Sequence, residues 1–143
     1  MGDLSITASA VLQSTAGQVT QGVAGATITQ GQALYVDTAS NNVLKLADSN
    51  AVSPANSIAG IALNGASAGQ IVNYCTQDAL FMPGTTLVAA DVLFLSDTPG
   101  GITKTVADVL SSSTLIVLGV CVTGGSATVA TVNFKPIVGG IVP

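Results

Sequence analysis

Four short blocks of this 143-residue sequence occur twice, at a nearly constant spacing. The matched blocks are LYVDT (34–38) with LFLSDT (93–98), KLAD (45–48) with KTVAD (104–108), GIALNGAS (60–67) with GVCVTGGS (119–126), and VNY (72–74) with VNF (132–134). Leu93 follows Leu34 by 59 positions, and Phe134 follows Tyr74 by 60. A shared spacing predicts an internal duplication, with pseudo-repeats at about residues 27–76 and 86–135. Chance similarity between repetitive strand and turn segments is the alternative.

Sequence patterns typical of strands occur throughout the chain, whereas patterns typical of helices are nearly absent. Apolar and small polar residues alternate with period two, and turn formers such as Asn64-Gly65 separate the alternating segments. Short strands are predicted at residues 4–12, 18–23, 33–37, 43–47, 58–63, 70–76, 79–82, 92–96, 114–122 and 127–134. We therefore expect an all-β fold, a single compact β-barrel or sandwich at residues 18–143. Residues 1–17 are expected to form an extended N-terminal strand or arm.

The charge content of the chain is unusually low. The chain has seven Asp and only three Lys residues, and Glu, Arg and His do not occur. Charged residues make up 7% of the chain and hydrophobic residues 48%, with a mean hydropathy of +0.66. A soluble domain usually carries about 25% charged residues, so this chain has little charge with which to cover its apolar area. We expect part of the surface to be hidden against partners; a monomer with a neutral surface is the alternative.

Several partners and locations are disfavoured by the same composition. A membrane-spanning helix needs about 20 consecutive, mainly apolar residues, and the longest apolar run here, residues 115–122, is short and rich in β-branched residues. The N-terminus lacks the pattern of a signal peptide, so synthesis in a cytosol is the expectation. A net charge of -4 with scattered Lys residues argues against binding to nucleic acid.

The chain also lacks the residues that most catalytic sites require. Acid–base catalysis near neutral pH usually recruits His, Glu or a Lys with a shifted pKa. Cys75 and Cys121 lie in apolar segments and are expected to be free, buried thiols, although they could pair in an oxidising compartment. A dyad of Asp37 and Asp97 is formally possible, but the Asp-Thr-Gly element of aspartic hydrolases is missing after both. We expect no enzyme activity, no cofactor and no metal site.

The sequence of this chain resembles the small capsid decoration (cement) proteins of tailed bacteriophages in four segments, at residues 23–37, 43–48, 58–70 and 93–102. The similarity covers most of residues 23–122. It implies a β-rich head protein, made in the host cytoplasm, that sits on the outside of the expanded virion shell. Such a protein would contact the major capsid protein and its own copies. Residues 1–12 lie outside the similar segments.

The resemblance leads to a hypothesis about binding. Leu4, Ile6 and Ala8 of the leading strand are predicted to add to a sheet edge on the capsid or on a sister subunit, because unpaired edges attract such strands. An ordinary first strand of the barrel is the alternative. A trimer is favoured as the oligomer, since it fits the three-fold positions of an icosahedral lattice. The rival functions are another phage structural module (tail, fibre base or receptor-binding component) and a small β-barrel enzyme or ligand carrier.

Overall fold

The computed structural model describes residues 3–106, 109 and 113–141, and it confirms the all-β class. A short 3-10 turn, η1 (Ala8–Ala10), precedes the strands. The strands are β1 (Val11–Leu12), β2 (Gln18–Val23), β3 (Ala33–Asp37), β4 (Val43–Leu46), β5 (Gly60–Ala62), β6 (Ile71–Pro83), β7 (Val92–Leu95), β8 (Ile102–Thr103), β9 (Thr114–Thr123) and β10 (Thr131–Ile141).

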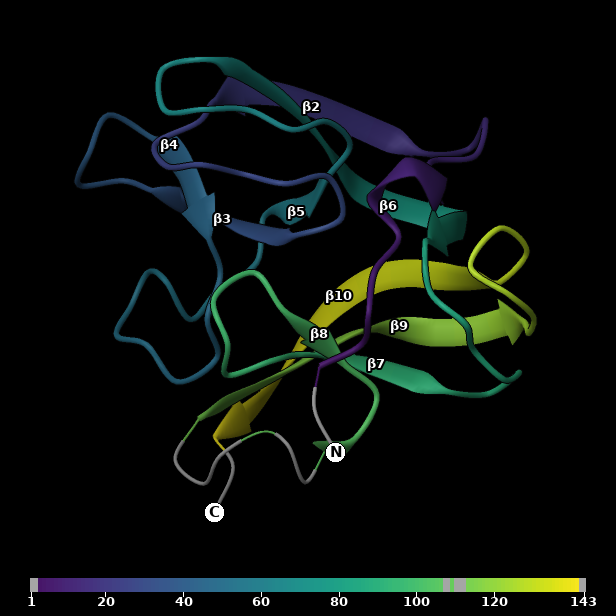
Figure 1. Cartoon of the computed structure of the whole chain (residues 1–143). Coiled ribbons are helices and arrows are strands. Elements are labelled where there is room, and N and C mark those ends of the chain that lie inside the picture. Colours follow the sequence, from purple (N-terminus) through teal and green to yellow (C-terminus); the bar gives the residue numbers. More distant parts are fainter. Residues whose placement is uncertain (1–2, 107–108, 110–112, 142–143) are drawn as a thin grey trace.

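The strands form one curled antiparallel sheet, a half-barrel, in the order β4-β3-β5-β6-β10-β9-β7-β8 (Figure 1). This order reads as two equal series that meet between β6 and β10. Three of the four repeated blocks overlap matching strands, namely β3 and β7, β5 and β9, and β6 and β10. In the fourth, KLAD begins on β4, whereas KTVAD begins after β8 and ends outside the described residues. We call β2–β5 with the start of β6 the first half, and the rest of β6 with β7–β10 the second half.

The spacing of 59 residues recurs in the hydrogen bonds of the two halves. Two isolated bridges, each with a pair of backbone hydrogen bonds, connect a loop to the turn after β5 or β9, and the residues of one lie 59 positions after those of the other. A turn hydrogen bond and a strand pairing repeat in the same way. The matched pairs are Ile28–Ala66 with Leu87–Gly125, Gly31–Ala62 with Ala90–Cys121, and Ala33–Ile61 with Val92–Val120. The two halves are therefore structurally equivalent.

Two buried clusters support this sheet. The smaller one fills the first half and includes Leu34, Leu44 and Tyr74. The larger one fills the second half, where the rings of Phe81 and Phe134 lie 5.5 Å apart between centroids. It also takes in side chains from the other face of the first half, namely Ala33, Tyr35, Ala47, Ile61 and Cys75. Strands β3 and β5 of the first half are thus buried on both faces.

The structure corrects several predicted boundaries. The strands predicted at residues 70–76 and 79–82 are one strand, β6, whose central Asp78 is buried. Strand β8 was not predicted, and β10 begins at Thr131 and runs to Ile141. Pro136 lies where the pairing of β10 with β9 shifts between Phe134 and Ile137. A shift is expected there because proline cannot donate a ladder hydrogen bond.

The strand predicted at residues 4–12 is largely wrong. Only β1 pairs, with Val11 opposite Pro83 and Leu12 opposite Met82. Asp3–Thr7 is assigned no regular structure, and its backbone N–H groups bond at two separate points rather than along one neighbour: Leu4 N–H to Ile102 O and Thr7 N–H to Gly84 O. The leading segment is therefore an arm that crosses the ends of other strands (Figure 1).

Candidate interaction surfaces

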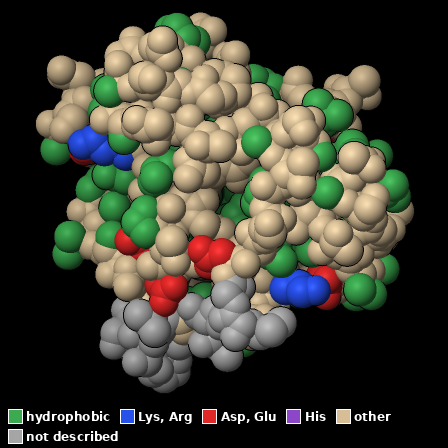
Figure 2. All heavy atoms as spheres, in the orientation of Figure 1, with side chains coloured by type: hydrophobic (Ala, Val, Ile, Leu, Met, Phe, Trp, Pro, Cys, Tyr) green, Lys and Arg blue, Asp and Glu red, His purple; other side chains and the backbone are tan. Residues whose placement is uncertain are grey.

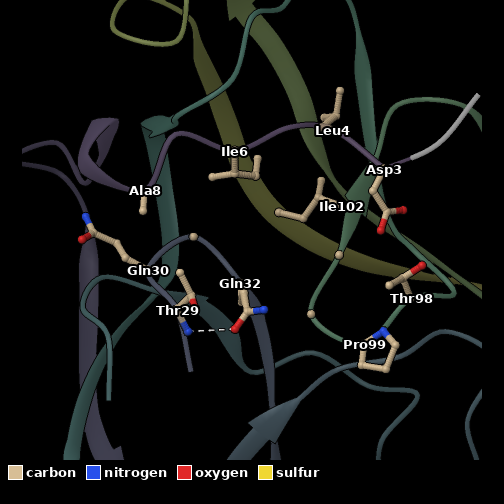
Figure 3. A pocket seen from close by; sticks show the side chains of 13 residues that line it. Asp3, Leu4, Ile6, Ala8, Thr29, Gln30, Gln32, Thr98, Pro99 and Ile102 are labelled. Atoms are coloured by element: carbon tan, nitrogen blue, oxygen red, sulfur yellow. Dashed lines mark hydrogen bonds between the residues drawn. The ribbon is translucent and has the colours of Figure 1, made fainter. Parts of the chain in front are cut away.

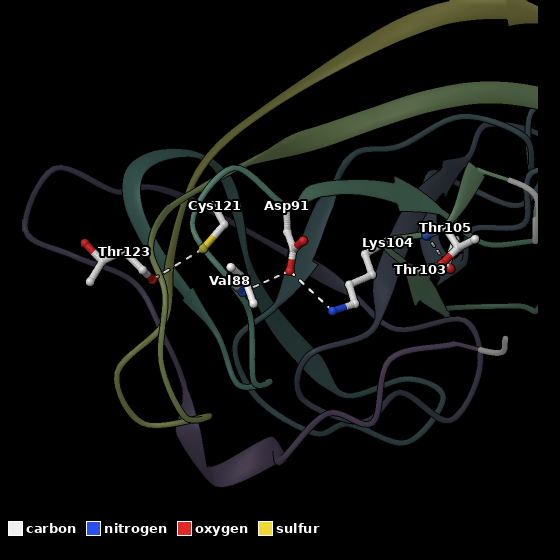
Figure 4. Close-up of polar contacts among 7 residues, drawn as sticks. All are labelled: Val88, Asp91, Thr103, Lys104, Thr105, Cys121 and Thr123. Carbon is white, nitrogen blue, oxygen red and sulfur yellow. Dashed lines mark hydrogen bonds and ion pairs between the residues drawn. The ribbon is translucent and has the colours of Figure 1, made fainter.

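The two thiols are buried and free, as the sequence predicts. Burial raises the pKa of Cys75 to about 11, and it raises the pKa of Cys121 as well. The Cys121 thiol donates to the carbonyl of Thr123 at 3.3 Å (Figure 4). Both groups are therefore protonated near neutral pH, and a protonated, buried thiol is a poor nucleophile.

Five of the carboxylates, those of Asp3, Asp37, Asp48, Asp78 and Asp91, accept hydrogen bonds from backbone or side-chain groups. Asp91 accepts from Val88 N–H at 2.9 Å and from Lys104 Nζ at 3.3 Å (Figure 4). Asp37 lies 2.8 Å from Lys45 Nζ, and the hydrogen bond from Lys45 lowers the pKa of Asp37. In the described residues, no group of three or more Asp, Glu, His or Cys side chains is placed to hold a metal ion. Nor does this part contain a helix long and apolar enough to span a membrane.

Buried Asp78 fixes the turn that follows the arm. Its carboxylate accepts a hydrogen bond from Ser14 N–H at 2.6 Å and another from the Ser14 hydroxyl. It also accepts from Leu80 N–H at 3.0 Å, within its own strand. These contacts satisfy a carboxylate that is only 1% exposed, which explains how a charged residue fits in the middle of β6.

The predicted binding residues Leu4, Ile6 and Ala8 lie together along one groove, and all three are partly buried in this chain (Figure 3). Leu4 and Ile6 pack against the larger cluster. The groove has a volume of about 320 Å³ and is completed by residues 29–32 and 98–102. Binding of a partner by these three side chains remains a prediction, and the contacts they make here are with their own chain.

The arm, residues 3–12, closes the second half of the sheet. In the first half, Gly25 N–H bonds directly to Leu44 O of β4 at 2.8 Å. The position equivalent to Gly25 is Gly84, and the arm lies between Gly84 and β8, with one hydrogen bond to each. Val11, at the end of the arm, is 1% exposed within the larger cluster. The arm is therefore part of the core.

The outer side of β7, β9 and β10 carries an apolar surface that sequence analysis did not single out. Strand register places Phe94, Val117 and Ile137 side by side, and Val92 beside Val120. Val122 follows on β9, two residues after Val120 on the same side of the strand. We call these six residues the valine face. Val120, Val122 and Ile137 are 43%, 52% and 58% exposed, and the other three are partly exposed.

The equivalent surface of the first half is covered. Val92 and Val120 correspond to Ala33 and Ile61, which are 0% and 2% exposed. Ile61 belongs to the larger cluster together with Val11 of the arm. Alignment of the two repeats could have pointed to this surface, because Val92 and Val120 are aliphatic like Ala33 and Ile61, although only the first half buries these positions. No family model, curated protein or solved structure matches this chain.

Few charges accompany the apolar side chains on the surface. Figure 2 shows one side of the molecule, where hydrophobic groups are interspersed with uncharged polar groups and charged groups are sparse. Lys45 and Lys104 are each paired with an Asp. Such a surface favours contacts made by apolar burial and by backbone hydrogen bonds rather than by ion pairs.

Proposed function

We propose that the protein is a capsid decoration (cement) protein of a tailed bacteriophage. It binds the outer surface of the expanded head and stabilises contacts between major capsid subunits. The observation that carries the proposal is the valine face, a registered group of apolar side chains left uncovered on a body with few charges. The resemblance of residues 23–122 to this protein class supports the same function.

The mechanism is adhesion without chemistry. Burial of apolar surface contributes about 25 cal/mol per Å², so each half-exposed valine or isoleucine adds only a modest amount. Many copies on one lattice act together, because multivalent attachment multiplies weak affinities. An apolar contact is also not weakened by charge screening in salt, unlike an ion-paired one. Attachment of the protein across neighbouring capsid subunits would oppose the outward pressure of packaged DNA.

The arm and the oligomeric state remain open parts of this proposal. Addition of Leu4, Ile6 and Ala8 to a partner sheet requires the arm to leave its groove, which exposes Val11 and opens the second half. The valine face needs no such rearrangement, so it is the contact that we favour. A trimer at the three-fold positions of the lattice also remains a prediction.

The test is co-sedimentation with expanded capsids of the phage that encodes this chain. We expect Val120→Asp and Val122→Asp to reduce binding at least tenfold, because each buries a charge in an apolar contact. Val52→Asp is the matched control, since Val52 is 86% exposed and lies outside the valine face. Thermal melts check that all three variants fold.

Two results would overturn the proposal. One is failure of the wild-type chain to bind heads. If it binds isolated tails instead, the result would favour a tail or fibre-base component. The other is equal binding by the wild type and by both valine-face variants.

A further inference from the structure

The groove beside the arm combines an apolar wall with a polar end. Leu4 and Ile6 line it and are only partly buried. Asp3 and Thr98 also line it, and Figure 3 shows both at the same end. Its volume of about 320 Å³ lies at the lower end of the range for ligand pockets, about 300–1,000 Å³. The groove therefore has room for a long side chain or a short segment rather than for a large molecule.

Three aspartates lie near one another around Ser96, at the end of the groove that holds Asp3. The Asp3 carboxylate accepts a hydrogen bond from the Ser96 hydroxyl, and Asp97 is the next residue in the chain. Asp48 is brought close because the N–H of its neighbour Ser49 donates to Ser96 O at 3.0 Å. Figure 2 shows acidic side chains close together on one side of the molecule, apart from the lysine side chains.

No ion pair reaches these three carboxylates within the described residues, where the lysines that form ion pairs are bound to Asp37 and Asp91. Asp97 is partly buried, and in the same part of the chain its carboxylate accepts no hydrogen bond. Like charges gathered in one place repel, so this arrangement costs stability in the free protein. Uncompensated charge of one sign beside a groove also attracts groups of the opposite charge. This end of the groove is the exception on a surface that carries few charges.

We propose that the groove binds a basic segment of a partner protein, with a lysine or arginine side chain laid along Leu4 and Ile6 and its charged end at the aspartates. The hydrocarbon stem of such a side chain covers apolar surface while its charged head stays in a polar environment. Gln32 also lines the groove. Its Oε1 accepts from Thr29 N–H at 2.8 Å, so its amide NH₂ can donate to a backbone carbonyl of the segment.

This assignment lets the predicted binding residues Leu4, Ile6 and Ala8 act while the arm stays in place. A nucleic acid does not fit the same groove, because its phosphates would meet the carboxylates. The contact also differs in kind from one made by the valine face. Salt screens attraction between charges, whereas it does not weaken an apolar contact in this way.

Binding of a model peptide to the native full-length chain tests the role of charge. The probe is Lys-Leu-Lys-Leu-Lys, blocked at both ends, and Glu-Leu-Glu-Leu-Glu is its control. Only the basic peptide should bind, and its affinity should fall about tenfold between about 50 mM and 500 mM NaCl. Asp97→Asn should weaken binding about fivefold. Asp91→Asn is the matched control, because it removes the same charge from a carboxylate that is already paired with Lys104.

Thermal melts separate a binding role from a structural one. Asp97→Asn should not lower the melting temperature of the free protein, because it removes repulsion and breaks no hydrogen bond within the described residues. Thr98 is exposed, and Thr98→Lys places an ammonium group of the chain itself near the aspartates. This variant should raise the melting temperature and prevent peptide binding. Thr98→Gln, which adds a side chain of similar length without charge, should do neither.

Four results would overturn the proposal. Equal binding of the two peptides is one, and equal losses for Asp97→Asn and Asp91→Asn are another. A third is binding of calcium by a wild-type chain that binds neither peptide, because the carboxylates would then belong to a metal ion. The fourth concerns place: the basic peptide should change the amide chemical shifts of Gly100 and Gly101, and changes confined to the valine face would put it elsewhere.

These assays use no capsid, so the groove and the decoration function can fail separately. Val120→Asp, which is expected to reduce capsid binding, should leave peptide binding unchanged. A chain that binds capsids but not the basic peptide would retain the proposed function and lose this inference.

Discussion

Truncation of Val11 tests whether the arm is part of the core. Val11→Ala removes two carbon atoms from a side chain that is 1% exposed. At about 0.8 kcal/mol for each buried carbon, with a further cost for the cavity, we expect a loss of about 2–3 kcal/mol in the free energy of unfolding.

The next residue supplies the control. Leu12 is 53% exposed, so Leu12→Ala removes more carbon atoms but should cost less than about 1 kcal/mol. Urea denaturation followed by circular dichroism measures both variants, and the midpoint should fall for Val11→Ala with an unchanged slope. Equal losses for the two variants, or a larger loss for Leu12→Ala, would refute the view that the arm closes the second half. Deletion of residues 2–12 would then also be a clean test of partner binding.

Three further predictions concern the thiols, a surface ion pair and two glycines. Because the pKa of Cys75 is about 11 and both thiols are buried, a thiol-specific reagent at pH 8 should label the native chain at least a hundredfold more slowly than the unfolded chain. The pKa of Asp37 is lowered in the folded state, so its pairing with Lys45 is fully stabilising above the ordinary value of 3.8 and is lost as the pH falls through the lowered pKa. Lys45→Met should therefore lower the melting temperature at pH 7, and the difference from the wild type should shrink as the pH is lowered below 3.8. Gly60→Ala and Gly119→Ala should each prevent stable folding, as judged by thermal melts, since an added Cβ would lie 2.3 Å from a carbonyl oxygen on the neighbouring strand in both cases.

The duplication and most strands were predictable because they depend on local pattern. Strands β2, β3 and β7 lie within one residue of the predicted ranges, since alternation and turn residues mark both of their ends. Three of the four repeated blocks overlap matching strands, because identical spacing produces identical register. A pattern of this kind also fixes which face of a strand is apolar, although it does not say what covers that face.

An N-terminal strand or arm was expected, but the packing of this arm within its own chain was beyond such reasoning. Leu4, Ile6 and Ala8 alternate with polar residues, as in a strand, and an extended segment that packs in a groove requires the same alternation. The choice between the two depends on whether a neighbouring strand is free to pair, which is a property of the assembled fold. The single strand β6 was missed for a related reason: Asp78 lies in the gap between the two predicted strands, and its burial depends on a contact with Ser14, 64 positions away.

The difference between the two halves bears directly on function. Isolated hydrophobic side chains on a surface are normal and need no explanation. Val92 and Val120 are not isolated, because they are paired across two strands at the positions where the first half buries Ala33 and Ile61. If water were the final environment of this face, polar side chains such as Thr would fit the same strands with equal ease. Aliphatic residues at these positions are instead what a buried sheet face requires, and this supports the proposal that a partner covers the second half where the first half is covered by its own chain.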